Sequence, residues 1–154
     1  EPLRLRLLYL AERLGFAARR EGLGARRLTL RLDYSDGRSA SATARQPRLL
    51  ARDNEIAEAA WALARRAMER RVRVRRLSVE LSDLGSAGPE LDLFEPADAK
   101  AQRLQTALDR VHGKYGLFAL TPGAFLGAGL AMPDDALPRI PPRAAALGFA
   151  GEGA

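Results

Sequence analysis

Apolar residues recur along the first half of the chain with two different periods, which predict its helices and strands. Between Leu3 and Arg20 they return every three or four residues, as on one side of a helix. Residues 26–33 and 38–45 instead alternate between apolar and polar positions. This predicts two strands joined by the hairpin turn Ser35-Asp36-Gly37.

A second helix and a third strand are predicted after a connector at residues 46–52, which contains Pro47. The helical pattern runs to about residue 70, with Asp53 or Asn54 as its N-cap. Alternation returns over residues 71–84, but the apolar positions change phase between Val74 and Leu77. A β-bulge, or a strand that starts near Arg75, would explain this change.

The last part of the chain is expected to hold one more helix and an irregular tail. A helix is predicted over residues 97–112, with an apolar stripe formed by Ala101, Leu104, Leu108 and Val111. From residue 117 onward Gly, Pro and Ala dominate without a sustained period. The predicted fold class is therefore α+β: an antiparallel sheet of three to four strands with two helices on one face, followed by a C-terminal helix and a tail.

One face of the predicted sheet is polar and rich in arginine and hydroxyl side chains. Its members are Arg27, Thr29, Arg31, Ser39, Ser41, Thr43, Arg45, Arg76 and Ser78. Alternating strands often turn such a face to water with no further role. The sharper interpretation is a surface that follows a nucleic-acid backbone through phosphate contacts. No aromatic residue lies on this face, which favours a duplex over stacked single strands.

Composition changes this picture only slightly. The chain has 154 residues and a formal net charge of +6, and arginine supplies all but two of its 25 basic residues. A GC-rich genome would produce the same bias, so the count supports an anionic partner only weakly. Cysteine is absent, which excludes disulfides and thiolate chemistry. No long apolar run or signal peptide is evident, and a cytoplasmic location is expected.

Residues 90–94 read Glu-Leu-Asp-Leu-Phe and form an apolar cluster between segments rich in glycine and proline. These flanks disfavour both a helix and a central strand. An exposed apolar cluster needs a cover, which is either the domain itself or a partner's pocket.

Four segments together resemble the little-finger domain of Y-family DNA polymerases. Residues 24–38 are similar to its opening hairpin, and residues 73–84 to its last strand. Residues 90–94 fall where bacterial members carry a sliding-clamp motif, and residues 100–116 resemble the helix that follows. The resemblance spans residues 3–116 and covers both active polymerases of the DNA polymerase IV type and non-catalytic relatives in mutagenic repair assemblies.

The resemblance implies contact with template–primer duplex DNA through phosphates. Arg75, Arg76 and Ser78 fall on backbone-contacting positions of the last strand, and Ser41 and Thr43 on those of the second hairpin strand. Arg27 and Arg31 are added because they face the same side. The implied clamp-binding residues are Glu90, Leu91, Asp92, Leu93 and Phe94.

The chain departs from the family pattern in three places. Glu80 stands where a basic or neutral residue is common, and would either pair with Arg31 or weaken DNA binding there. Glu90 replaces the usual glutamine at the head of the clamp motif. The family's first strand precedes the first helix, and residues 1–2 are too short to supply it.

The sequence predicts no catalytic centre in this chain. Its acidic residues do not form the paired arrangement that holds catalytic metals, so no cofactor is expected, and Mg²⁺ would belong only to a catalytic parent protein. Asp134 and Asp135 lie in the proline-rich tail. His112 is the single histidine and lies near a helix end, which makes a catalytic triad implausible.

The expected organisation is a little-finger-like domain (residues 1–84), a flexible segment with the clamp motif (85–96), a helix (97–116) and a tail (117–154). The leading hypothesis is sequence-independent binding of duplex DNA with recruitment to the bacterial sliding clamp, as part of a translesion polymerase. A non-catalytic adaptor that acts through protein contacts, including the tail, is the first alternative. An unrelated α+β RNA-binding domain is the second.

Overall fold

The computed structural model describes residues 2–68, 72–87, 96–117, 119–120 and 122–125. The elements in chain order are α1 (Pro2–Arg20), β1 (Leu23–Tyr34), β2 (Ser39–Leu50), α2 (Asp53–Ala67), β3 (Val74–Ser86), α3 (Pro96–Tyr115) and a short 3₁₀ turn (Gly123–Phe125). None of the described helices is long and apolar enough to cross a membrane.

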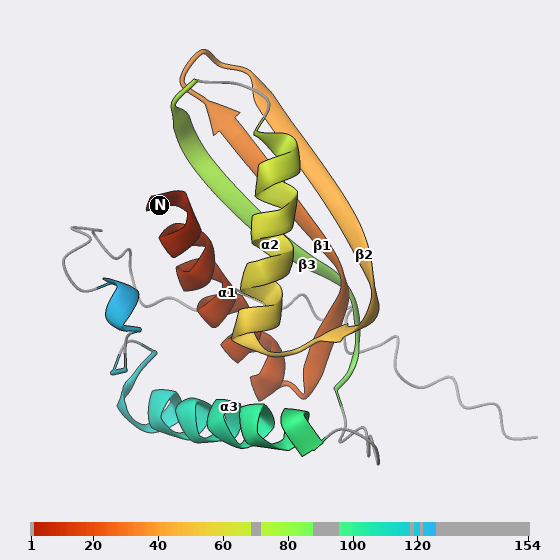
Figure 1. The fold of residues 1–154 in the computed structure, drawn as a ribbon, viewed down its shortest axis with the longest axis vertical. Coiled ribbons are helices and arrows are strands. Elements are labelled where there is room, and N and C mark those ends of the chain that lie inside the picture. The colour runs from red at the N-terminus through yellow and green to blue at the C-terminus, as the bar shows by residue number, and fades with distance from the viewer. Residues whose placement is uncertain (1, 69–71, 88–95, 118, 121, 126–154) are drawn as a thin grey trace, which may run out of the picture.

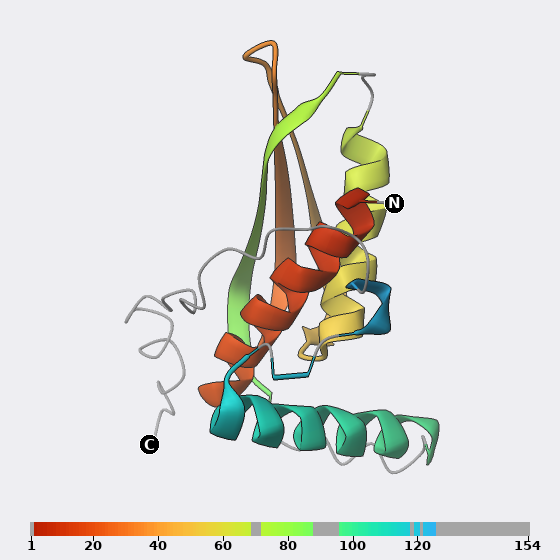
Figure 2. The same ribbon diagram turned by 90° about the vertical axis from the view of Figure 1, so that its left-hand side faces the viewer.

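The three strands form one antiparallel sheet in the order β2-β1-β3. α1 and α2 pack side by side on one face of this sheet (Figures 1 and 2). No other described element lies over the opposite face. α3 crosses the end of the domain where α1 ends and β1 begins (Figure 1). The predicted α+β fold class is confirmed.

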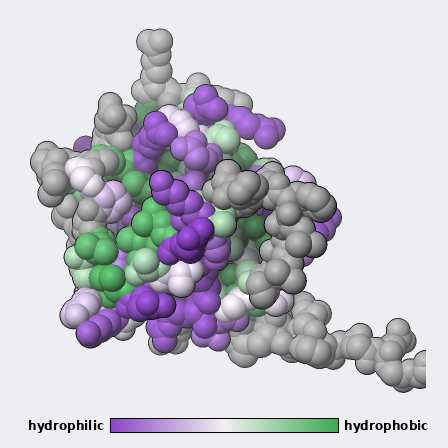
Figure 3. Space-filling model, turned by 60° about the horizontal axis from the view of Figure 1, so that its bottom comes forward, coloured by the Kyte–Doolittle hydropathy of each residue, from purple (hydrophilic) through white to green (hydrophobic). Residues whose placement is uncertain are grey.

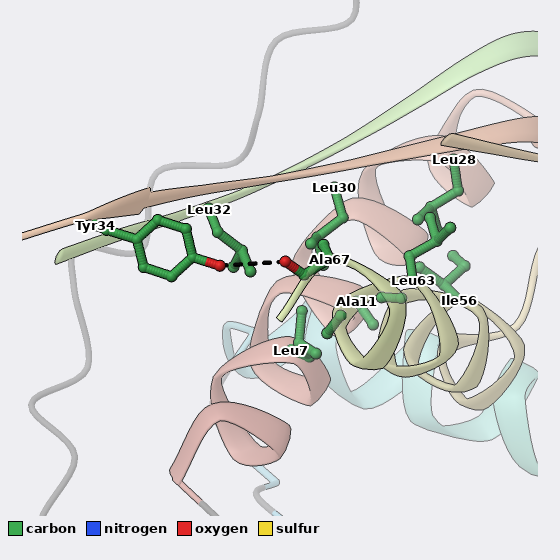
Figure 4. Packing of buried hydrophobic residues seen from close by; sticks show 11 residues of the cluster. Leu7, Ala11, Leu28, Leu30, Leu32, Tyr34, Ile56, Leu63 and Ala67 are labelled. Atoms are coloured by element: carbon green, nitrogen blue, oxygen red, sulfur yellow. Dashed lines mark hydrogen bonds between the residues drawn. The ribbon is translucent and has the colours of Figure 1, made fainter. Parts of the chain in front are cut away.

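The core lies between the central strand and the two helices (Figure 4). Leu28, Leu30 and Leu32 alternate along β1 and are fully buried. Each such side chain contributes about 1.5–3 kcal/mol through removal of its apolar surface from water. At the end of β1, the Tyr34 hydroxyl donates a hydrogen bond of 3.2 Å to the carbonyl of Ala67, at the end of α2. Apolar packing and this hydrogen bond thus both hold β1 against α2.

The prediction that residues 46–52 form a connector was wrong, because β2 continues to Leu50 and includes Pro47. β2 is an outer strand, and the pairing register shifts between Ala25↔Leu50 and Arg27↔Arg45. A proline, which cannot donate to a ladder, is tolerated at an outer strand or a bulge.

The β-bulge that the change of apolar phase predicted in the third strand is confirmed. Asp33 pairs with Arg76 and Tyr34 pairs with Val74, so Arg75 is the extra residue of a bulge. The bulge lets Val74 and Leu77 both pack against the core although they are three residues apart.

Two details of the predicted helices were wrong. The N-cap of α2 is Arg52 rather than Asp53 or Asn54, and the Arg52 backbone N–H donates to the carboxylate of Glu55 at 3.1 Å. In α3, Leu104 of the predicted stripe is 61% exposed, and the buried residues are Gln105 and His112. The most deeply buried side chains of α3 are therefore polar, which an apolar pattern cannot reveal.

Candidate nucleic-acid interface

The face of the sheet opposite the helices carries hydroxyl and charged side chains from all three strands, and is called the polar face below. Its members are Arg27, Thr29, Arg31, Asp33, Ser39, Ser41, Thr43, Arg45, Arg76, Ser78, Glu80 and Ser82. The register sets them in rows across the sheet. Ser41 and Ser78 flank Arg31, and Thr43 and Glu80 flank Thr29, with 3.0 Å between the two threonine hydroxyls.

The structure brings most of the predicted DNA-binding residues together on this face. They are Arg27, Arg31, Ser41, Thr43, Arg76 and Ser78. The seventh, Arg75, is the bulge residue of β3 and is exposed, and the register leaves it out of the rows of this face. Sequence alternation alone placed six residues correctly because each strand keeps a strict two-residue period over the region concerned.

Acidic side chains neutralise part of the positive charge on the polar face. Asp33 accepts hydrogen bonds from the Ser39 hydroxyl (2.8 Å) and from Arg31 Nε (3.0 Å). Arg76 Nη1 lies 4.0 Å from the other oxygen of Asp33. The Ser39 hydrogen bond and then that of Arg31 lower the pKa of Asp33, so this carboxylate stays ionised at neutral pH.

The other charged residues of the polar face are Arg45, Arg27 and Glu80, and only Arg45 forms an ion pair among the described residues. Arg45 forms an ion pair of 3.3 Å with Asp83. Arg27, between Arg45 and Ser82 in its row, has no ion pair within the described part of the chain. Glu80 lies opposite Thr29 rather than forming the pair with Arg31 that the sequence left open, and Arg31 pairs with Asp33 instead.

A second concentration of arginine lies at the edge of β3, in a hollow of about 770 Å³ beside α1. Four arginines line it, Arg6, Arg73, Arg75 and Arg76, above apolar side chains that include Leu3 and Leu77. No acidic residue is among the described residues that line it. Arg6 and Arg73 were not singled out from the sequence, because only the packing of α1 beside β3 brings them near the bulge.

A third group of charged residues joins α3 to the two other helices, around Arg19. Its Nε and Nη2 donate to the two oxygens of Asp109 at 2.6 and 2.7 Å, and its Nη1 donates to Asp53 Oδ1 at 2.8 Å. Gln105 Nε2 donates to Asp53 Oδ2 at 2.9 Å. Nothing in the sequence pattern predicts this network, whose members are up to 90 residues apart. It holds α3 and has no direct part in the polar face.

Two carboxyl groups in this region have raised pKa values. Burial, and then the charge of Asp53, raises the pKa of Glu12 to about 7. Burial also raises the pKa of Asp53, although the guanidinium of Arg19 opposes that effect. These shifts make the helix interface sensitive to pH.

Within the described residues, no group of three or more His, Cys, Asp or Glu side chains is placed to hold a metal ion. His112 is buried against the ring of Phe16, with ring centroids 5.8 Å apart. Glu90, Leu91, Asp92, Leu93 and Phe94 lie outside the described residues, as do Asp134 and Asp135. The clamp motif therefore stays a prediction.

The family model described as the impB/mucB/samB family C-terminal domain matches residues 1–93. DNA polymerase IV of Dehalococcoides mccartyi (strain CBDB1) is 28% identical to this chain over 123 residues. The match covers 79% of this chain and 31% of that polymerase, so the chain spans about a third of this relative. The chain belongs to the impB/mucB/samB C-terminal family, and it is a little-finger domain of the Y-family DNA polymerase type.

Proposed function

We propose that this chain binds duplex DNA without sequence preference, as the accessory domain of a translesion DNA polymerase. The observation that carries the proposal is the polar face, where the register of three strands gathers Arg27, Arg31 and Arg76 among serine and threonine hydroxyls. Arginine, serine and threonine side chains make many of the phosphate and sugar contacts in protein–DNA complexes, and such contacts position a duplex without reading its sequence.

The size of the polar face suits a duplex groove. Adjacent strands lie about 4.8 Å apart, which places the outer strands β2 and β3 about 10 Å from each other. The major groove of B-form DNA is about 12 Å wide and admits a two-stranded ribbon, so this three-stranded face would lie across the groove and contact the phosphates on its two sides. The helices cover the other face, so a duplex would approach from the side that no described element blocks (Figure 2).

The charge distribution favours the β3 side as the stronger half of the interface. Ion pairs with Asp33 and Asp83 engage Arg31 at 3.0 Å and Arg45 at 3.3 Å, whereas Arg76 comes only to 4.0 Å from Asp33. The hollow at the β3 edge instead gathers Arg6, Arg73 and Arg75 beside Arg76. We therefore assign the largest share of phosphate contacts to Arg75 and Arg76.

Fluorescence anisotropy at low salt tests this function with four labelled probes. The proposal expects equal affinity for two DNA duplexes of unrelated sequence and weaker binding to single-stranded DNA, because the face has no aromatic residue for stacking. Preference for an A-form RNA duplex over both DNA duplexes would instead favour the RNA-binding alternative.

We also propose recruitment to the sliding clamp through residues 90–94. The motif begins four residues after the end of β3, the strand to which we assign most phosphate contacts. A tether to a ring on the same DNA would raise the local concentration of duplex, so weak binding by the polar face would suffice.

A pull-down with purified sliding clamp tests this second part of the proposal. Leu93→Ala with Phe94→Ala should abolish capture. Leu104→Ala with Tyr115→Ala is a matched control, because it removes a leucine and an aromatic ring that are both exposed on α3. Equal capture of the two double variants would exclude the motif as the clamp contact.

One observation favours the adaptor as a second candidate. The positive charge of Arg31, Arg45 and Arg76 is partly neutralised by Asp33 and Asp83, and Glu80 adds a further negative charge to the same face. In an adaptor, DNA binding would be dispensable, and the parent protein would need neither Mg²⁺ nor polymerase activity. Loss of clamp capture would then abolish recruitment in the parent protein, whereas Arg75→Ala with Arg76→Ala would leave it unchanged.

A further inference from the structure

The exposed large hydrophobic side chains among the described residues gather on α3 and just after it. They are Leu104, Tyr115 and Leu120, which are 61%, 66% and 45% exposed. Figure 3 shows the end of the molecule on which α3 lies, where hydrophobic residues are exposed among hydrophilic ones. Apolar side chains gathered in one place indicate an interaction surface, whereas single exposed ones do not.

Four apolar residues form a stripe along this helix, called the α3 stripe below. Leu104, Leu108, Val111 and Tyr115 recur at spacings of four, three and four residues, which places them on one side of a helix. Leu108 and Val111 are half-buried, so the stripe is most accessible at its two ends. The buried Gln105 follows Leu104 by one residue and is turned about 100° from it. The stripe therefore lies beside the docking side of α3 and is open to a partner.

Basic residues follow the α3 stripe on the side away from the domain, and are called the basic row below. They are exposed and have no ion pair within the described part of the chain: Lys100, Arg103, Arg110 and Lys114. Asp109 is the only acidic residue in the sequence between positions 99 and 117, and Arg19 donates to both of its oxygens. The helix itself therefore leaves the charge of the basic row unbalanced.

This combination fits an apolar segment that carries carboxylates. A nucleic-acid strand could meet the basic row, but it would leave the α3 stripe in water. A second copy of the chain, packed stripe against stripe, would bring two basic rows together, and like charges disfavour such an interface.

The chain itself offers a segment of this kind at residues 130–137, Leu-Ala-Met-Pro-Asp-Asp-Ala-Leu. Asp134 and Asp135 are the only acidic residues in the sequence between positions 118 and 151, and the arginines at positions 139 and 143 lie outside the segment. Residues 90–94 also combine acidic and apolar side chains, but we have assigned them to the sliding clamp.

The length of the chain allows this segment to reach α3. The last described residue, Phe125, is buried, and Asp134 follows it by nine residues, which can span up to about 30 Å. The α3 stripe, from Leu104 to Tyr115, is about 17 Å long.

We propose that residues 130–137 dock on the α3 stripe. Asp134 and Asp135 face the basic row, and the leucine and methionine side chains of the segment cover the stripe. Weak contacts suffice, because the segment and α3 belong to one chain. The contact shares no residue with the polar face, so it holds the tail on α3 and leaves the proposed DNA interface open.

Paramagnetic broadening in nuclear magnetic resonance spectra tests this contact in the 154-residue chain. The sequence has no cysteine, so Ala136→Cys provides a single site for a nitroxide label. The backbone signals of Leu104 and Tyr115 should lose at least half of their intensity relative to the chain with a reduced label, whereas those of Ser41 and Thr43 on β2 should not. A mixture of isotope-labelled chains without nitroxide and unlabelled chains with nitroxide should show no broadening.

Charge reversal tests the pairing of the two surfaces. Asp134→Lys with Asp135→Lys in the nitroxide-labelled chain should remove most of the broadening, and adding Arg103→Glu with Arg110→Glu should restore at least half of it. Arg38→Glu with Arg48→Glu is the matched control, because both arginines are exposed away from α3, and it should restore nothing.

Three results would overturn the proposal. Absence of broadening on α3 would show that residues 130–137 do not occupy the stripe. Broadening that appears in the mixture would show that a second copy supplies the contact. Broadening that survives the aspartate reversal would show that the basic row does not hold the segment.

Discussion

Replacing Glu12 by glutamine should remove much of the pH dependence of folding stability. Burial and the charge of Asp53 raise the pKa of this carboxyl from its ordinary value of 4.5 to about 7. The folded chain therefore keeps a proton that the unfolded chain releases above about pH 4.5. Stability from this proton is fully present below that pH and is lost as the pH rises through about 7.

The magnitude follows from the two pKa values. Each tenfold change in proton affinity corresponds to about 1.4 kcal/mol, so the difference between 4.5 and about 7 sets an upper limit of about 3.5 kcal/mol. Residual contact of Glu12 with solvent screens this effect. We expect the free energy of unfolding to fall by about 1–2 kcal/mol between pH 5 and pH 8 because of Glu12.

Urea unfolding at pH 5 and pH 8, followed by the fluorescence of the single tryptophan, Trp61, measures this change. Glu12→Gln should match the wild type at pH 5 and exceed it by about 1–2 kcal/mol at pH 8, because its neutral amide avoids the cost of burying a charge. Glu58→Gln is the control, since Glu58 is exposed and pairs with Arg4. Identical pH dependence in the wild type and Glu12→Gln would refute the reasoning.

Three further substitutions test other parts of the structure. Arg19→Met should lower the free energy of unfolding by about 3–5 kcal/mol in urea titrations, because it leaves Asp53 buried without its cation; a loss below 1 kcal/mol would contradict this role. Leu30→Ala should cost about 2–5 kcal/mol by the same measurement, since Leu30 is fully buried in the core; a negligible loss would show that Leu30 is not packed in the core. Asp33→Asn should raise duplex DNA affinity about two- to fivefold in anisotropy by releasing Arg31 and Arg76, whereas unchanged or weaker binding would show that Asp33 orients these arginines productively.

The sequence predicted the parts of the fold that depend on local periodicity. Alternation in β1 gave both the buried leucines and the outward arginines, because each strand places successive side chains on opposite faces. The change of phase near Arg75 even revealed the bulge. Pro47 led to the prediction of a connector, but an outer strand accepts proline, and β2 continues through this residue.

Features that depend on distant residues could not be read in this way. The ion pairs of Arg19 join residues of three helices, and the apolar stripe of α3 pointed to Leu104 rather than to the buried Gln105. Arg6 joins the arginines beside the bulge only through packing of α1. Such contacts follow from tertiary structure, so no local pattern marks them.

The salt dependence of duplex binding tests the central claim most directly. Anisotropy titrations over a range of salt concentrations give the slope of log affinity against log salt for the wild type and for Arg75→Ala with Arg76→Ala. Loss of two phosphate contacts should make the slope less steep by about 1.8. Arg103→Ala with Arg110→Ala removes the same charge from α3 and should leave the slope unchanged. Absence of duplex binding at low salt, or equal slopes for the two double variants, would contradict the account.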